Sequence, residues 1–149
     1  MSKRFAQFLS RGGVLLMSLL IAACAPPGPE MSAPEAHAAA DAGALTLVDI
    51  RTPQEWRQTG VPAGAYRVNM LQPAGNKGFV REILYLTGGD RSAPVGLICR
   101  TGNRSSQMQR VLSSEGFTTV YNVREGVAGS RAGPGWMRRG LPLAPCPTC

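Results

Sequence analysis

The stretch that decides the fold is residues 95–106, Val95-Gly96-Leu97-Ile98-Cys99-Arg100-Thr101-Gly102-Asn103-Arg104-Ser105-Ser106. Residues 95–99 form a short apolar run, which is typical of a buried strand. From Arg104 to Glu115 apolar residues recur at helical spacing, and Gly116 marks the end of that helix. A strand, a short glycine-containing loop and a helix therefore follow one another, with a cysteine where the strand ends.

Strand and helix patterns alternate on both sides of this segment. We expect strands at 45–50, 66–69 and 118–123, a helix beginning at Thr52-Pro53, a helix at 79–86 and a short helix around Trp136. Parallel strands need crossover connections, and the expected helices supply them. The order predicts an α/β fold, with a central, mainly parallel sheet and helices on both faces of a single domain.

Residues 1–23 have the pattern of an export signal. Three basic residues precede the apolar run 14–23, which as a helix spans about 15 Å of a roughly 30 Å hydrocarbon core. The junction Ile21-Ala22-Ala23-Cys24 resembles a bacterial lipobox, in which Cys24 is lipidated. Cleavage after Ala25 is the alternative, although Pro26 would then follow the cut. We expect a periplasmic protein, anchored to the outer membrane if Cys24 carries lipid.

Residues 24–44 are rich in Ala and Pro and show no apolar period, so we predict a linker. The folded domain is expected over 45–145, followed by a Cys-x-x-Cys tail at 146–149. His37 is the only histidine of the chain and is expected to be a solvated linker residue. A site with several histidines, or a catalytic triad, is therefore excluded, and we predict neither a metal nor a cofactor.

The expected domain is basic. From Leu45 onward the chain has 13 Lys and Arg against 6 Asp and Glu, a balance that attracts anions. Nucleic acid is a poor candidate, because the sequence predicts export and shows no alternation of aromatic and basic residues. Either a small anion binds this surface, or the surface is simply solvated and weakly drawn to membranes. The sequence does not indicate an oligomeric state.

Cys99 stands where an anion site would form. Ligands of open parallel sheets bind beyond the carboxyl ends of the strands. A tight loop there can turn its amides inward, and the following helix adds positive charge at its N-terminus. Arg100 and Arg104 add two full charges, and such surroundings favour the thiolate. With no histidine nearby, the loop itself would activate the sulfur; the alternative is an inert buried cysteine.

At this point the sequence resembles the rhodanese family. The resemblance covers 45–143 and rests on LVDIRTPQEW at 47–56, CRTGNRS at 99–105 and VREGVAGSRAGPGW at 123–136. It implies an α/β fold, a catalytic Cys99, and a sulfur-binding cradle formed by Arg100, Thr101, Gly102, Asn103 and Arg104. It also implies that three polar residues brace the first strand and helix, namely Asp49, Arg51 and Glu55. Within the turn-rich loop 60–64, Val61 replaces a histidine common in the family.

The implied activity is that of a thiosulfate sulfurtransferase. Sulfur would pass from an anionic donor such as thiosulfate to Cys99 as a persulfide, and then to a thiol or cyanide. Six residues run from Cys99 to Arg104, whereas related phosphatases have seven, and a smaller ring suits one sulfur atom better than a tetrahedral oxyanion. A non-catalytic module of the cell envelope that binds sulfur or a partner, and a thiol redox protein, are the alternatives.

The sequence closes with Cys146-Pro147-Thr148-Cys149. Redox-active Cys-x-x-Cys pairs usually begin a helix, and none is expected here. In an oxidising envelope a simple disulfide is one interpretation. The other is a redox pair that accepts sulfur from Cys99 or resolves its persulfide.

Overall fold

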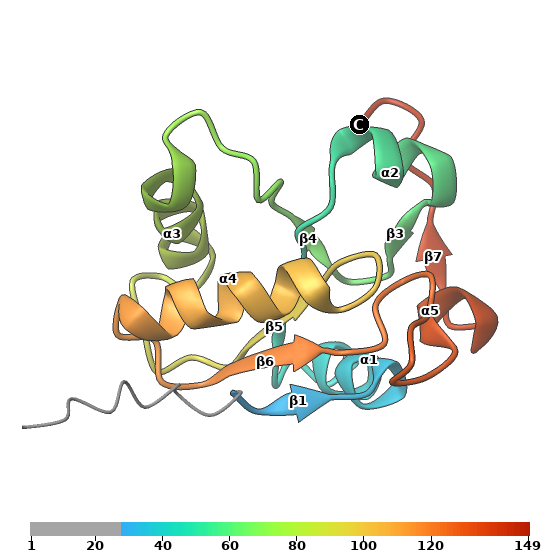
Figure 1. Cartoon of the computed structure of the whole chain (residues 1–149), viewed down its shortest axis with the longest axis horizontal. Coiled ribbons are helices and arrows are strands. Elements are labelled where there is room, and N and C mark those ends of the chain that lie inside the picture. Colours follow the sequence, from blue (N-terminus) through green and yellow to red (C-terminus); the bar gives the residue numbers. More distant parts are fainter. Residues whose placement is uncertain (1–27) are drawn as a thin grey trace, which may run out of the picture.

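The computed structural model describes residues 28–149 as an α/β fold (Figure 1). Its elements are β1 (Glu30–Met31), α1 (Ala33–Asp41), β2 (Thr46–Asp49), α2 (Pro53–Thr59), β3 (Val61–Pro62), β4 (Tyr66–Arg67), α3 (Gly75–Leu86), β5 (Val95–Ile98), α4 (Asn103–Ser114), β6 (Val120–Val123), α5 (Gly135–Arg138) and β7 (Leu143–Ala144).

The central sheet has five strands in the order β1-β6-β5-β2-β4, and every pair in it is parallel. The predicted parallel sheet is therefore confirmed. β5, which precedes Cys99, lies in the middle of the sheet between β2 and β6. A central strand gives the loop that follows it a firm support.

Helices cover both faces of the sheet, as predicted. On one face, Phe79 and Ile83 of α3 and Met108 and Leu112 of α4 pack against the apolar strand residues, and Cys99 belongs to this cluster. On the other face, residues of α1 and α5 form a second cluster around Trp136. The alternation of side chains along each strand supplies both layers.

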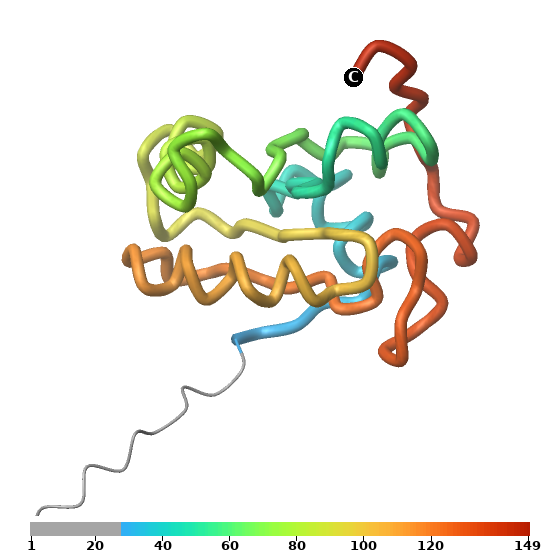
Figure 2. The backbone as a smooth tube through the Cα atoms, turned by 45° about the horizontal axis from the view of Figure 1, so that its top comes forward, coloured from blue at the N-terminus to red at the C-terminus, as the bar shows by residue number. Residues whose placement is uncertain are grey.

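The prediction that residues 24–44 form a linker is wrong from residue 30 onward. Glu30 and Met31 pair with the edge of β6, and the blue segment in Figure 2 runs along that edge. Helix α1 follows, with Ala33 and Ala36 fully buried. His37 is not a solvated residue either, because its ring lies edge-on to Trp136, with centroids 5.5 Å apart. The domain therefore begins before residue 45.

Local signals explain why this segment folds. Ser32 and Glu35 form a capping box at the start of α1, which satisfies amides that the first turn leaves free. Buried Glu125 accepts hydrogen bonds from the Ala33 amide at 3.2 Å, the Gly135 amide at 2.9 Å and the Arg139 guanidinium at 2.7 Å. One carboxylate thus joins the starts of α1 and α5.

The other elements differ little from the prediction. Thr52 caps α2 in a capping box with Glu55. Residues 60–64, expected as a loop, contain β3, which pairs with β7 in an antiparallel ribbon.

The predicted signal peptide and the lipidation site Cys24 lie outside the described residues. Within residues 28–149, no helix has the length and apolarity needed to cross a membrane.

Candidate functional site

Cys99 lies at the carboxyl end of β5, and its side chain is fully buried. Its Sγ accepts a hydrogen bond of 3.1 Å from the Gly102 amide. Gly102 has φ +88°, and a Cβ there would lie 2.1 Å from the Arg124 carbonyl oxygen. Only glycine fits, so this residue allows the amide to turn toward the sulfur.

The loop after Cys99 is held by the segment that follows β6. The Val127 amide donates to the Cys99 carbonyl at 2.8 Å, and the Ala128 amide donates to the Arg100 carbonyl at 2.9 Å. These two hydrogen bonds tie the backbone of the loop to residues 127 and 128. Fewer amides face the sulfur than predicted. Among the described residues, Gly102 supplies the one backbone N–H that donates to Cys99 Sγ.

A buried polar network behind the sulfur was missed by the sequence analysis. The Ser105 hydroxyl lies 3.3 Å from Cys99 Sγ, 3.0 Å from the Gly102 carbonyl oxygen and 2.7 Å from Asn122 Oδ1. A hydroxyl has one proton, so it donates to one of these acceptors at a time. An anionic sulfur is the strongest acceptor of the three, so we expect the proton to face Cys99 when the thiol ionises.

Replacing Ser105 with alanine should lower the free energy of unfolding by about 1–3 kcal/mol, because buried Asn122 then loses a hydrogen-bond partner. Urea denaturation measures this. Ser113→Ala, at an exposed position of the same helix, is the matched control and should stay within about 0.5 kcal/mol of the wild type. Equal stability of the two variants would show that the network contributes nothing.

Glu55 and Arg104 form an ion pair that joins α2 to the start of α4. The two guanidinium nitrogens lie 2.8 and 2.5 Å from the two carboxylate oxygens. Burial raises the pKa of Glu55, but the Arg104 hydrogen bonds, the Thr52 contacts and the attraction of Arg104 outweigh it and lower that pKa to about 2. The hydrogen bond to Glu55 raises the pKa of Arg104, although burial lowers it, and nearby Cys99 adds to the rise. Arg104 therefore lies beside the sulfur with its charge largely balanced by Glu55.

This pair predicts how stability depends on pH. The folded pKa of Glu55 lies near 2, below its ordinary 4.5, so the stabilisation is full above pH 4.5 and is lost as the pH falls toward 2. Glu55→Gln should cost about 1–3 kcal/mol of unfolding free energy at neutral pH and progressively less in acid. Urea denaturation of the variant and the wild type from pH 7 to pH 2.5 measures this cost.

The exposed acid Glu115 provides the control variant Glu115→Gln, which should match the wild type across this range. If the difference in unfolding free energy between Glu55→Gln and the wild type stayed constant down to pH 2.5, the account would be contradicted.

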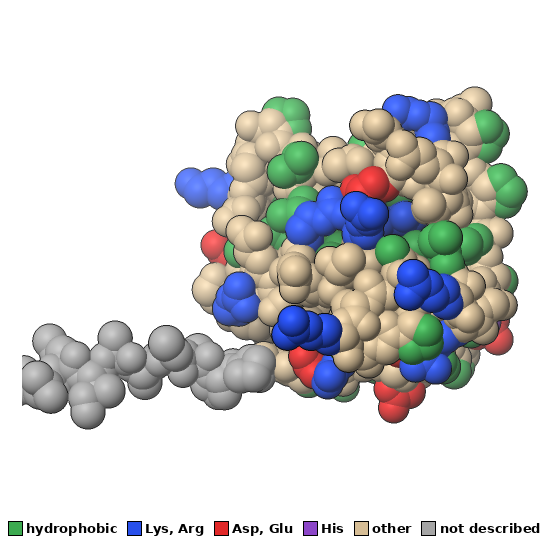
Figure 3. All heavy atoms as spheres, turned by 45° about the vertical axis from the view of Figure 1, so that its right-hand side comes forward, with side chains coloured by type: hydrophobic (Ala, Val, Ile, Leu, Met, Phe, Trp, Pro, Cys, Tyr) green, Lys and Arg blue, Asp and Glu red, His purple; other side chains and the backbone are tan. Residues whose placement is uncertain are grey.

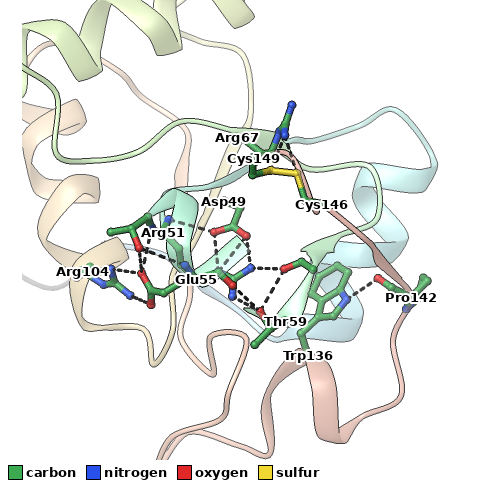
Figure 4. Close-up of polar contacts among 12 residues, drawn as sticks. Asp49, Arg51, Glu55, Thr59, Arg67, Arg104, Trp136, Pro142, Cys146 and Cys149 are labelled. Atoms are coloured by element: carbon green, nitrogen blue, oxygen red, sulfur yellow. Dashed lines mark hydrogen bonds and ion pairs between the residues drawn. A yellow bond between two sulfur atoms is a disulfide. The ribbon is translucent and has the colours of Figure 1, made fainter. Parts of the chain in front are cut away.

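Asp49 and Arg51 form a separate, buried pair. Arg51 Nη2 lies 2.6 Å from Asp49 Oδ2, and the same guanidinium donates to Thr59 Oγ1 and to the Gly60 carbonyl, each at 2.7 Å. Figure 4 shows this network under α2. The three residues expected to brace the first strand and helix therefore belong to two separate ion pairs. Asp49 pairs with Arg51, whereas Glu55 pairs with Arg104.

Two surface depressions flank the loop that covers Cys99. One, of about 300 Å³, is lined by residues that include Arg51, Glu55, Arg100 and Met137. The other, of about 500 Å³, is lined by residues that include Thr101, Gly102, Asn103, Arg124 and Arg131. Basic side chains gather at the centre of the face shown in Figure 3. Cys99 lines neither depression, so its buried thiol does not open directly into either of them.

The Cys-x-x-Cys tail contacts Arg57 and Arg67. Cys146 and Cys149 form a disulfide, and Arg67 Nη1 contacts both sulfurs, at 2.7 and 2.6 Å (Figure 4).

Val61, where the rhodanese pattern often has histidine, is buried in β3. Within residues 28–149, no three His, Cys, Asp or Glu side chains cluster in a way that could hold a metal ion.

Comparison with known proteins gives consistent matches. The model of the rhodanese-like domain family matches residues 32–132. A sulfurtransferase of Allochromatium vinosum is 31% identical over 104 residues, which cover 70% of this chain and 82% of the relative.

Two solved structures share both fold and sequence with this chain. A crystal structure from M. tuberculosis is 31% identical with a TM-score of 0.61, covering 78% of this chain and 97% of that one. The polysulfide-sulfur transferase homodimer of Wolinella succinogenes is 26% identical with a TM-score of 0.60, covering 80% of each chain. The family match begins at residue 32, so it includes α1.

Proposed function

This chain belongs to the rhodanese-like domain family, and from that premise we propose that it is a sulfurtransferase that carries sulfane sulfur on Cys99. The observation that carries the proposal is the placement of Cys99 at the end of β5, with the Gly102 amide on its Sγ at 3.1 Å. The coarser part, a protein of sulfurtransferase type, follows from the family and from the Allochromatium relative. The donor, the acceptor and the role of each residue are proposals.

In the proposed reaction, the Cys99 thiolate attacks the outer sulfur of thiosulfate. A new S–S bond forms to Cys99, the S–S bond of the donor breaks, and sulfite leaves with the electron pair. An acceptor thiolate or cyanide then attacks the terminal sulfur, and Cys99 leaves as thiolate. This is covalent catalysis in two steps.

The surroundings of Cys99 support a charge on sulfur in both steps. The Gly102 amide already donates to Cys99 Sγ, and the Ser105 hydroxyl can turn its proton to the sulfur when the charge develops. Arg104 lies close enough to Cys99 to interact with its charge. Because Glu55 already balances Arg104, we assign the attraction of anionic donors chiefly to Arg100, which is exposed and has no ion pair among the described residues.

Access to Cys99 requires the loop to move, because the side chain has no exposed surface. The depression lined by Arg100, Arg51 and Met137 offers an approach beside the loop. Its volume of about 300 Å³ is ample for a small anion. We therefore expect donors the size of thiosulfate to react and bulky organic donors to react poorly.

A comparison of substrates tests the proposed sulfur transfer against the chemistry of the related phosphatases. The wild type should convert thiosulfate and cyanide to thiocyanate and should leave an aryl phosphate intact, because the loop from Cys99 to Arg104 suits one sulfur atom. Hydrolysis of the phosphate without thiocyanate formation would overturn the assignment. A protein that does neither, under several donors, would favour the non-catalytic envelope module.

We also propose that the protein works in the periplasm, held to the outer membrane through lipidated Cys24. The support is the sequence pattern of residues 1–24 alone. Cell fractionation tests it: the wild type should sediment with membranes and a Cys24→Ala variant should be released. A wild type found in the cytoplasm would contradict the localisation.

A further inference from the structure

The disulfide contacts a residue at the carboxyl end of a strand, on the same side of the sheet as Cys99. Arg67, at the end of β4, is in register with Asp49 of β2, which in turn pairs with Ile98 just before Cys99. The tail follows β7, which pairs with β3, and Figure 4 shows its disulfide beside Arg67.

Positive charge surrounds the two sulfurs. Arg67 donates to both Sγ atoms, and the Arg57 guanidinium contacts the carbonyl oxygen of Cys149. The ion pairs formed within residues 28–149 all involve other arginines. Within residues 28–149, neither Arg57 nor Arg67 therefore forms an ion pair with an Asp or Glu side chain.

Both cysteines of the tail are partly exposed, but their surroundings differ. Cys146 lines two surface depressions, of about 330 and 260 Å³, that lie on either side of the tail. Cys149 lines neither of them. These depressions leave room for an incoming thiol beside Cys146, so we infer that Cys146 is the sulfur attacked.

We propose that Cys146–Cys149 is a redox-active disulfide that exchanges with an external dithiol reductant, with Cys146 attacked and Cys149 expelled. The reductant thiolate bonds to Cys146 Sγ, the disulfide bond breaks, and Cys149 leaves with the electron pair as a thiolate beside Arg67. The second thiolate of the reductant then attacks its own bridging sulfur and releases Cys146. The pair gains two electrons, and the reductant becomes a disulfide.

Arg67 is the positioning and tuning residue in this proposal. A disulfide is neutral, whereas the reduced pair carries thiolate charge, so a guanidinium on both sulfurs favours the reduced form. It also stabilises the leaving Cys149 thiolate and thereby speeds exchange. The chemistry does not depend on sulfur transfer by Cys99 and can be measured without it.

Redox titration of the full chain in a Cys99→Ser background tests the proposal, because the tail then carries the titrating pair. With glutathione buffers and thiol-specific labelling, Arg67→Gln should need about a tenfold higher ratio of reduced to oxidised glutathione for half-reduction. Arg81→Gln, at an exposed position of α3, removes an equal charge elsewhere and should behave as the parent. If the two variants titrate alike, or the parent pair resists reduction at every ratio, the proposal is wrong.

Variants that keep one of the two tail cysteines test the order of attack. In the same background, Cys149→Ser should form a mixed disulfide between Cys146 and oxidised glutathione about tenfold faster than Cys146→Ser forms one at Cys149. Mass spectrometry follows both reactions. An equal or reversed order would overturn the assignment of Cys146 as the attacked sulfur.

Discussion

A Cys99→Ser protein should form thiocyanate from thiosulfate and cyanide at least about a thousandfold more slowly than the wild type. Serine keeps nearly the same shape, so the buried site and its Gly102 contact should survive. A hydroxyl at neutral pH is a far weaker nucleophile than a thiolate and forms no persulfide. Initial rates at saturating thiosulfate measure the loss, and circular dichroism confirms that the variant is folded.

The matched control is the double variant Cys146→Ser/Cys149→Ser. In the proposed reaction cyanide takes sulfur directly from Cys99, so this variant should keep the wild-type rate in the thiosulfate–cyanide assay. A Cys99→Ser protein that retains a tenth or more of the activity would show that another group carries the sulfur. Loss of activity in the double variant alone would assign the chemistry to the tail.

Deleting residues 1–44 should lower the free energy of unfolding by at least about 3 kcal/mol. The deletion removes β1 from the sheet edge, takes buried Ala33 and Ala36 away from Trp136, and leaves Glu125 without one of its three donors. Burying that carboxylate with fewer partners costs more than the lost apolar area alone. Urea denaturation of the purified chain measures the change.

A chain that begins at residue 28 is the control for this deletion and should unfold at the same urea concentration as the full chain. The expected ranking separates a structural role of 28–44 from a role of the preceding residues. Equal stability of the chain that begins at residue 45 would restore the linker interpretation.

The sheet and its helices were predictable because their signals are local. Each central strand is a short apolar run, and Thr52-Pro53 at the start of α2 is a typical helix beginning. The position of Cys99 followed from one strand and one helix adjacent in the sequence. Contacts of this kind need no knowledge of distant residues.

The segment at 30–41 was misread because its buried side chains are small. Alanine gives almost no apolar periodicity, and the Pro-rich composition suggested a linker. The capping box at Ser32 and Glu35, with Pro34 between them, was the signal that could have revealed the helix. What holds it in place, Glu125 and Trp136, lies about a hundred residues away in the sequence, and a local pattern cannot show that contact.

The surroundings of Cys99 were only partly predictable for the same reason. The sequence placed Arg104 and Ser105 close to the cysteine, but not the side chains that pair with them. Glu55 lies 49 residues from Arg104, and Asn122 lies 17 residues from Ser105. These partners decide that Arg104 is largely neutralised and that Ser105 belongs to a buried network.

The measurement that tests the account most directly is peptide mass spectrometry after one turnover with thiosulfate, in the absence of acceptor. The account predicts that the peptide containing Cys99 gains the mass of one sulfur atom, that one sulfite is released per chain, and that cyanide removes the added sulfur. An unmodified Cys99 peptide after sulfite release, or the added sulfur found on Cys146 in a Cys99→Ser protein, would contradict it.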